Sequence, residues 1–148
     1  MTDEVVVDTN VLVYAYGGGD QRKQTIALAT LDRLVRTKRC VLPAQVLAEF
    51  FVVSRKKCVP PLTNAQAHER LEVLSQVCRV LDLTGLGVQE AARGVLSHSL
   101  SYWDAQIWAV ARLNQIPLIL SEDFSHGSTL GGVGFLNPFH ADFELASL

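Results

Sequence analysis

The sequence has few of the features that mark a disulfide-bonded or zinc-binding protein. It contains only three cysteines, Cys40, Cys58 and Cys78, which lie far apart and form no Cys-x-x-Cys pattern. This spacing favours small, buried, reduced thiols over a metal or redox role. The four histidines show neither His-x-His nor His-Glu-x-x-His spacing, so we expect no zinc site.

Long apolar runs and strong charge are also missing. No apolar run approaches the roughly 20 residues that span a bilayer, and the acidic start MTDE differs from the basic start of a signal peptide. We therefore expect a cytoplasmic protein with no membrane partner. The net charge of −2 at pH 7 does not by itself indicate a nucleic-acid partner. Two basic clusters, residues 36–39 and 55–57, are typical of solvated helix ends, and phosphate binding stays open for them.

Apolar residues are abundant. They make up 49% of the 148 residues, which is enough for the core of a single domain over residues 1–148. Short apolar runs alternate with longer helical stretches, and this predicts a mostly parallel sheet covered by helices on both faces. The predicted strands are residues 5–7, 40–42, 80–83, 117–120 and 133–136. The predicted helices are residues 9–16, 21–37, 43–56, 64–76, 87–98 and 101–114, approximately.

An aspartate interrupts the first apolar run, VVVDTNVLVYAY, at residues 5–16. An unpaired buried charge is costly, so chains avoid one unless it is matched or used. Asp8 lies at the carboxyl end of the first predicted strand, where open α/β sheets bind their ligands. Asp123 follows the fourth predicted strand, and the two carboxylates share one edge if these strands are neighbours. A turn is an alternative explanation for Asp123.

Two further acids lie on helix faces that carry apolar residues. Glu49 has valines three positions away on either side, where a solvated glutamate would have charged neighbours. Asp104 is followed at the next helical turn by Ile107 and Trp108, so its carboxylate points toward the core side. A capping box that begins at Ser101 is the alternative explanation for Asp104.

Four acids at strand ends and core-facing positions are difficult to explain by packing. Two like charges about 4 Å apart repel by roughly 1 kcal/mol in water and by about 4 kcal/mol at an effective dielectric constant near 20. A cluster of carboxylates therefore needs protons or cations, and oxygen ligands without His or Cys suit Mg²⁺ or Mn²⁺. Such ions bind substrate phosphates and activate water in phosphodiester hydrolysis. We therefore interpret Asp8 as a metal ligand.

Five short motifs follow one another along nearly the whole chain. They are VVDTNVL (6–12), AEF (48–50), YWDA (102–105), LSEDFSHG (120–127) and NPF (137–139). This ordered set resembles the PIN-domain family, and within it the VapC-like toxin ribonucleases of prokaryotic toxin–antitoxin pairs. Each motif alone is weak, whereas their order and spacing are specific. The resemblance implies a three-layer α/β/α PIN-like fold with a mostly parallel central sheet of about five strands.

The resemblance also implies an activity, a cofactor and partners. The protein is expected to be an endoribonuclease that depends on Mg²⁺ or Mn²⁺ and hydrolyses RNA. Four acids are implied to bind the metal and to be the catalytic residues: Asp8, Glu49, Asp104 and Asp123. Family members are typically homodimers, each held inactive by a small antitoxin protein whose segment reaches the acidic cleft.

The polar residues beside these acids have supporting or open roles. The resemblance implies that Asn10 and Ser121 orient ligands or waters. Thr9 either does the same or only caps a helix. Glu122 is a possible additional acid of the site, although we expect it to be a solvated neighbour.

Two other classes of function stay open. A haloacid-dehalogenase-type phosphatase also begins with an aspartate after an apolar strand, but it has a second aspartate two residues later, where this chain has Asn10. A non-catalytic PIN-like domain that binds RNA or a protein is expected to lose some of the acids, and all four are present here. Metal-dependent cleavage of RNA would distinguish these classes.

Overall fold

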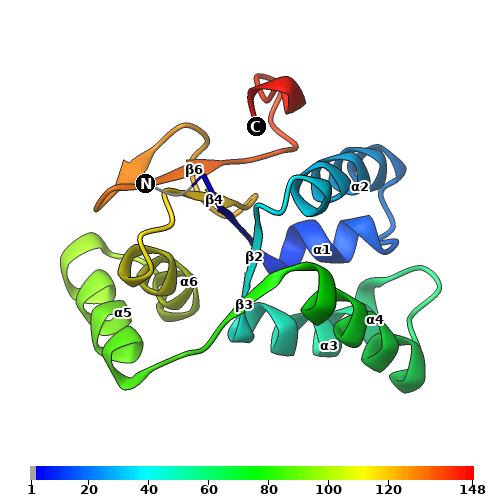
Figure 1. Ribbon diagram of the computed structural model, residues 1–148, viewed down its shortest axis with the longest axis horizontal. Coiled ribbons are helices and arrows are strands. Elements are labelled where there is room, and N and C mark those ends of the chain that lie inside the picture. The colour runs from blue at the N-terminus through cyan, green and yellow to red at the C-terminus, as the bar shows by residue number, and fades with distance from the viewer. Residues whose placement is uncertain (1–2) are drawn as a thin grey trace.

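A six-stranded sheet with helices on both sides is formed by residues 3–148, which the computed structural model describes (Figure 1). The strands are β1 (Val5–Val7), β2 (Cys40–Pro43), β3 (Arg79–Leu81), β4 (Leu118–Leu120), β5 (Thr129–Leu130) and β6 (Val133–Leu136). The helices are α1 (Thr9–Ala15), α2 (Gln21–Arg36), α3 (Ala44–Lys57), α4 (Asn64–Val77), α5 (Gly85–His98) and α6 (Tyr102–Leu113), followed by a short 3-10 helix, η1 (Leu145–Ser147). Within residues 3–148, none of these helices is long and apolar enough to cross a membrane.

The strand order is β3-β2-β1-β4-β6-β5, which places β1 in the interior of the sheet. All neighbouring strands are parallel except β5, which is antiparallel to β6. The α/β fold with a mostly parallel sheet is therefore confirmed, but the described chain has six strands, not about five. The missed strand β5 has only two residues, beside Gly131 and Gly132, and is too short to give an alternating pattern.

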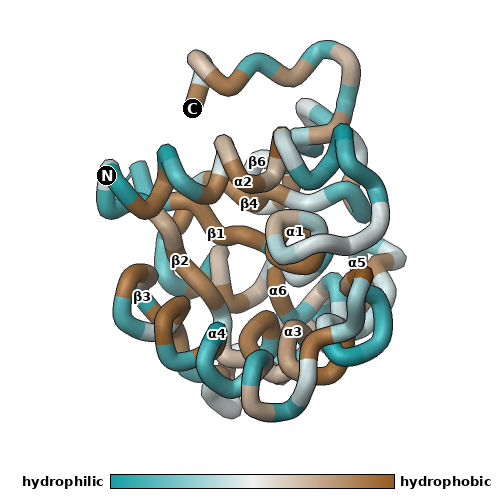
Figure 2. Tube along the Cα trace, turned by 90° about the vertical axis from the view of Figure 1, so that its right-hand side faces the viewer, coloured by the Kyte–Doolittle hydropathy of each residue, from teal (hydrophilic) through white to brown (hydrophobic). Residues whose placement is uncertain are grey.

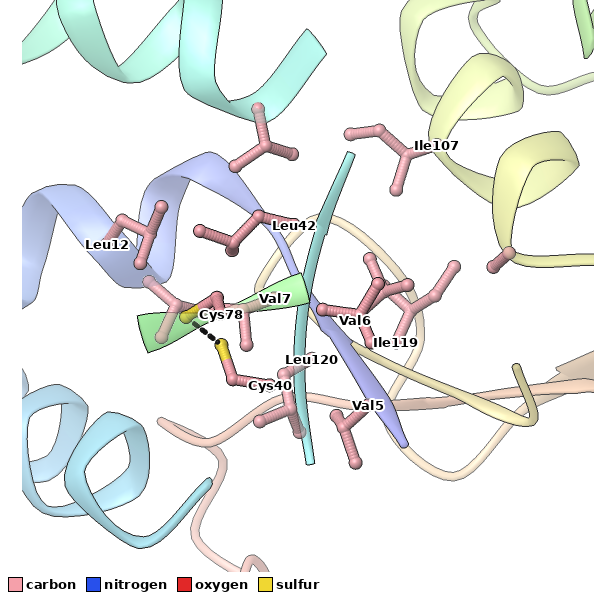
Figure 3. Packing of buried hydrophobic residues seen from close by; sticks show 14 of the residues in the cluster. Val5, Val6, Val7, Leu12, Cys40, Leu42, Cys78, Ile107, Ile119 and Leu120 are labelled. Carbon is pink, nitrogen blue, oxygen red and sulfur yellow. Dashed lines mark hydrogen bonds between the residues drawn. The ribbon is translucent and has the colours of Figure 1, made fainter. Parts of the chain in front are cut away.

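The interior strands consist of apolar residues because helices cover both of their faces. All residues of β1 and β2 are buried, and both strands run as hydrophobic segments through the middle of the molecule (Figure 2). Val6 points toward the side of α6, and Val7 points toward the side of α1 (Figure 3). Helices α1 to α4 lie on one side of the sheet, where α1 packs against α2 and α3, and α3 packs against α4. Helix α5 packs against α6 on the other side (Figure 1).

Side-chain caps fix several of the predicted helix starts. The Asp20 carboxylate accepts a hydrogen bond from the Lys23 backbone N–H (3.0 Å), and Thr63 begins a capping box at the start of α4. Such caps typically contribute about 1 kcal/mol each. Several boundaries differ from prediction by one or two residues. Pro43 is the last residue of β2 and precedes α3, and β3 begins at Arg79 and ends at Leu81, since the chain must then reach the cap of α5.

Close contact between α5 and α6 depends on Gly94. A Cβ atom at Gly94 would lie 2.8 Å from Cζ3 and 3.1 Å from Cε3 of Trp108. The Trp108 ring is fully buried, and its Nε1–H donates a hydrogen bond to the Leu130 carbonyl group (3.0 Å). The ring therefore cannot move aside without losing a contact between α6 and β5.

We predict that Gly94→Ala destabilises the protein by about 1–2 kcal/mol, because the overpacking cost exceeds the gain in helix propensity. Gly85→Ala is the matched control, since a Cβ atom at this position has nothing within 4 Å. Urea unfolding of both variants measures the difference. Equal stability of the two variants would show that the helices separate at little cost.

Candidate active site

The site begins where β1 and β4 end side by side. Val7 pairs with Leu120, and the Asp8 backbone N–H continues this ladder by donating to the Leu120 carbonyl group (2.9 Å). After β1 the chain returns to the sheet at β2 on one side, whereas β4 lies on the other side of β1. Ligands of open parallel sheets bind at such a switch point. The first and fourth predicted strands are therefore neighbours, so the condition under which Asp8 and Asp123 share one edge of the sheet is met.

A pocket of about 230 Å³ opens at this edge of the sheet, and acids from four parts of the chain line it. We call it the acid pocket. Four of its carboxylates are Asp8 after β1, Glu49 of α3, Asp104 of α6 and Asp123 after β4. The structure thus brings all four predicted acids together. Other predicted residues also line the pocket: Thr9, Asn10 and Glu122.

Asp8 is the most deeply placed acid of the pocket. Its side chain is only 3% exposed, with Oδ1 accepting a hydrogen bond from the Thr9 backbone N–H (2.7 Å) and Oδ2 accepting one from the Ser121 hydroxyl group (2.7 Å). Burial raises the pKa of Asp8 from 3.8 to about 7 against the opposing effect of these two bonds. Repulsion from Asp123 and Glu49 acts in the same direction as burial. Without a cation, this carboxyl is therefore partly protonated at neutral pH.

Glu49 is held by donors from two helices. Its Oε2 accepts a hydrogen bond from the Thr9 hydroxyl group (2.7 Å), and its Oε1 accepts one from Gln45 Nε2 (2.8 Å). Thr9 therefore orients Glu49 with its hydroxyl group, and the cap of α1 is Asp8. Gln45 Oε1 in turn accepts a hydrogen bond from Gln106 Nε2 (2.7 Å), which links α3 to α6. The sequence analysis missed both glutamines, although the i, i+4 spacing of Gln45 and Glu49 was visible.

Asn10 and Ser121 hold the loop that carries Asp123. Asn10 Nδ2 donates to Asp123 Oδ2 (3.1 Å) and to the Ser121 hydroxyl oxygen (3.3 Å), while Asn10 Oδ1 accepts from the Glu122 backbone N–H (3.3 Å). The Ser121 oxygen also accepts from the Asp123 backbone N–H (3.0 Å). The amide of Asn10 thus both donates and accepts, which an aspartate at this position could not do.

Electrostatic repulsion accompanies this arrangement. The pKa of Asp123 is raised, first by partial burial and then by repulsion from Asp104, against the lowering effect of the hydrogen bond from Asn10. Asp104 itself lies in the first turn of α6, where its backbone N–H donates to the hydroxyl group of the N-cap residue Ser101 (3.4 Å). In a capping box the Asp104 carboxylate would also accept a hydrogen bond from the Ser101 backbone N–H, and this second contact is not formed in the described residues. Within residues 3–148 the Asp104 carboxylate accepts no hydrogen bond, so it stays available to a ligand.

Glu122 lies in the acid pocket beside a cation. Lys23 Nζ forms an ion pair with Glu122 (2.9 Å) and also donates to the Tyr14 hydroxyl group (3.3 Å). The hydrogen bond to Glu122 raises the pKa of Lys23. The charge of Glu122 is therefore already compensated, which sets it apart from the other four acids.

The cationic side chains of the two basic clusters differ in their surroundings, even within one cluster. Arg36 lies in the last turn of α2 and pairs with Asp32 (2.8 Å), and Arg55 donates to the Asn64 side chain (2.8 Å). Lys57, by contrast, is an exposed residue that lines the acid pocket. It brings a positive charge to the rim of a pocket that is otherwise acidic.

Trp103 lines the same pocket and was not singled out by the sequence analysis. Its side chain is 62% exposed, and its ring packs edge-to-face against Tyr102 at a centroid distance of 5.0 Å. Its backbone carbonyl accepts a hydrogen bond from Gln45 Nε2 (3.2 Å). A large apolar ring is thus presented to solvent directly beside Asp104.

A family model described as PIN domain matches residues 5–127, from β1 to the loop that carries Asp123. The chain belongs to the PIN domain family. The predicted family is therefore confirmed. No curated protein gives a match to this PIN domain.

Solved structures with the same fold include proteins of toxin–antitoxin systems. A sarcin-ricin loop cleaving toxin, VapC20 of Mycobacterium tuberculosis, is 24% identical, with 78% of this chain and 87% of that chain covered and a TM-score of 0.61. A toxin–antitoxin complex from Klebsiella pneumoniae is 16% identical, with coverages of 92% and 98% and a TM-score of 0.69. DNA-bound VapBC from Salmonella typhimurium is 14% identical, with coverages of 90% and 97% and a TM-score of 0.64. At these identities the likeness establishes the fold.

The acid pocket of this PIN domain fits a hard cation by its donor chemistry. Its candidate ligands are carboxylate oxygens, which Mg²⁺ and Mn²⁺ prefer. The site is not a closed cage: in residues 3–148, no three Asp, Glu, His or Cys side chains form a group that could hold a metal ion. Neutral donors from Thr9, Asn10 and Ser121 lie between the acids. Mg²⁺ keeps several waters and needs only one or two carboxylates, so an open site is compatible with it.

The raised pKa of Asp8 predicts how stability depends on pH in EDTA. Between pH 5 and 8 the native state still binds a proton that the unfolded chain has lost, so the free energy of unfolding falls as the pH rises. We expect a loss of about 1–3 kcal/mol over this range in the wild-type protein. Asp8→Asn removes the titrating group and should flatten this dependence.

Urea unfolding at pH 5 and pH 8 tests this prediction, with Asp82→Asn as the control because Asp82 is an exposed acid outside the acid pocket. The stability of Asp8→Asn relative to wild type should be higher at pH 8 than at pH 5. The same pH dependence in all three proteins would mean that Asp8 titrates like a solvated acid.

Proposed function

We propose that this PIN domain is an endoribonuclease that depends on Mg²⁺ or Mn²⁺, and that it is the toxin of a VapBC-type toxin–antitoxin pair. The observation that carries the proposal is the acid pocket, in which four carboxylates from separate parts of the chain face one space. The proposal is also supported by solved structures of the same fold, which include a sarcin-ricin loop cleaving toxin and a toxin–antitoxin complex.

The cation is proposed to bind among the carboxylates of Asp8, Glu49, Asp104 and Asp123, of which one or two would contact it directly and the others through its waters. A cation in the acid pocket would contact a substrate phosphate and activate a water molecule. The chain itself orients the ligands, because Thr9 and Ser121 hold the carboxylates of Glu49 and Asp8, and Asn10 holds Asp123. Glu122 is left out of the proposed set, since Lys23 already binds its carboxylate.

RNA is the proposed substrate because the walls of the acid pocket offer more than acids. Lys57 provides a positive charge for a phosphate of the chain, and the exposed Trp103 ring provides a surface on which an unstacked base can lie. Base–aromatic stacking is worth about 1–3 kcal/mol per base. A phosphatase for small phosphomonoesters needs no such ring. The contacts of Asn10, which require an amide, also argue against the haloacid-dehalogenase alternative.

We predict that the purified protein cleaves RNA with Mg²⁺ or Mn²⁺ and not with EDTA. Asp104→Asn should lower the cleavage rate at least about 100-fold, because losing even a neighbour of a metal ligand typically costs 10–100-fold. The substitution keeps the backbone N–H that donates to the N-cap residue Ser101. The melting temperature should therefore stay unchanged, or rise as the repulsion between residue 104 and Asp123 is relieved. Mapping of cut ends in total RNA and thermal melts measure both effects.

The control for this experiment is Asp82→Asn, which removes a charge outside the acid pocket and should leave the cleavage rate unchanged. Undiminished cleavage in EDTA would contradict the metal mechanism. RNA binding without cleavage under every metal condition would favour the non-catalytic alternative.

We further propose that a small antitoxin protein inhibits this chain by placing a cationic side chain in the acid pocket. An arginine there would form charge-assisted hydrogen bonds with the carboxylates and replace the charge of the metal. The homodimer stays a prediction that rests on the resemblance alone.

We predict that the product of a small neighbouring gene co-purifies with this protein when the two are expressed together and inhibits RNA cleavage. Inhibition should weaken in the Asp104→Asn background, as measured by the affinity of the pair. If the chain is harmless when expressed alone and cleaves no RNA, the toxin proposal fails, although the PIN fold stands.

A further inference from the structure

Two of the three cysteines, far apart in sequence, meet beside the sheet. The Sγ atoms of Cys40 and Cys78 lie 2.9 Å apart and share a hydrogen bond (Figure 3). Cys40 is the first residue of β2, and Cys78 directly precedes β3. Both are free thiols and are 3% and 7% exposed, respectively. Buried thiols without a redox role were predicted from the sequence, whereas their contact was not. The acid pocket does not use this contact.

The register of the strands places the two cysteines at a separation that is compatible with a disulfide. The register of β2 and β3 pairs Val41 with Arg79, so Cys40 and Cys78 are the next residues toward the amino ends of two parallel strands. Neighbouring strands lie about 4.7–4.9 Å apart. Disulfides join Cα atoms about 4.4–6.8 Å apart. Oxidation of the pair therefore needs only a small movement of the side chains.

The same geometry argues against a metal site at these sulfurs. Zinc–thiolate bonds of about 2.3 Å in a tetrahedral site hold two sulfurs nearly 4 Å apart, which is wider than the observed distance. In the described part of the chain, no third Cys, His, Asp or Glu completes a metal-binding group with the pair.

Small molecules can reach the pair from outside. A second pocket, of about 590 Å³, is lined by both cysteines and by Lys38 and Arg79. Lys38 and Arg79 are exposed, and Arg79 pairs with Glu4 (2.7 Å). The thiolate form of a cysteine is the nucleophile in thiol–disulfide exchange. The shared hydrogen bond lowers the pKa of Cys78. These features make Cys78 the thiol that reacts first.

We propose that Cys40 and Cys78 form an oxidation site at which a small disulfide, such as oxidised glutathione, produces an intramolecular disulfide. The Cys78 thiolate attacks one sulfur of the small disulfide, whose S–S bond breaks and releases one thiolate, which takes up a proton. Cys40 then loses its proton and attacks the Cys78 sulfur of the mixed disulfide, which releases the second small thiol. The two cysteines together lose two hydrogens, and one small disulfide becomes two thiols.

The resulting bond would link two strands without touching the acid pocket. It would close the segment between Cys40 and Cys78, a sequence separation of 38 residues that contains α3 and α4. Glu49 and Lys57 lie in this segment, but the sulfurs sit at the amino ends of the strands, whereas the acid pocket lies at the carboxyl ends. Oxidation should therefore stabilise the fold through the unfolded state and leave the pocket intact.

The test is to incubate the native wild-type protein with oxidised glutathione at several ratios to reduced glutathione, and to block the remaining thiols after denaturation. Trypsin places the cysteines on separate peptides, residues 40–55, 58–70 and 71–79. We expect peptides 40–55 and 71–79 to be recovered joined by a disulfide, with Cys58 free. The oxidised monomer should melt roughly 5–15 °C higher than the reduced monomer.

Cys58→Ala is the matched control, since Cys58 is a buried thiol whose Sγ donates a hydrogen bond to the Val13 carbonyl oxygen (3.8 Å) and not to another cysteine. This variant should oxidise like the wild type. Cys40→Ala should stop at a mixed disulfide on Cys78. Three free thiols after native oxidation, a mixed disulfide as the end product in the wild type, or a disulfide that includes Cys58 would each overturn the proposal. The peptide analysis needs only the wild-type protein, so it decides the question even if a variant fails to fold.

Discussion

Burial of the Asp8 carboxylate at the end of an interior strand constrains the rest of the site. A carboxylate removed from water must be bonded or neutralised, and here two short hydrogen bonds from Thr9 and Ser121 do this only in part. The residual cost appears as the raised pKa of Asp8. The groups that hold Asp8 also hold its neighbours, because Thr9 also bonds Glu49, and Ser121 also bonds Asn10. The acids are thus joined through uncharged donors.

This arrangement separates two kinds of acid within one pocket. Glu122 has its own cation in Lys23, so its charge is balanced by the chain itself. Asp104 and Asp123 repel each other, and Asp104 accepts no hydrogen bond in the described residues. A carboxylate whose charge is not compensated by a group of the chain can be neutralised by a cationic ligand. The contrast is a physical basis for assigning ligand binding to some carboxylates and a structural role to another.

Two acids of the site were predictable because each one breaks a local pattern. Asp8 interrupts an apolar run, and Glu49 lies among valines, so the sequence alone marks both as unusual. Lys57 and Trp103 break no pattern, since a lysine at a helix end and an aromatic residue in a helix are both ordinary. Their position in the pocket depends on how α3 and α6 approach each other across the sheet, which no local pattern encodes.

The fold shows the same division between local and long-range information. Strands, helices and caps were predicted from composition and period, and most boundaries agree within one or two residues. The strand β5 and the contact between Cys40 and Cys78 were not predicted. A two-residue strand is defined only by its partner β6, and the two thiols meet only because β2 and β3 are neighbours.

The bridge between Gln45 and Gln106 has a consequence for how the pocket responds to its solution. These two amides join α3 to α6, which carry Glu49 and Asp104 on opposite walls of the acid pocket. The bridge carries no net charge, so salt does not screen it as it screens the repulsion between Asp104 and Asp123. A change in ionic strength therefore alters the interactions among the charged groups of the pocket, while this link between its two helices keeps its strength.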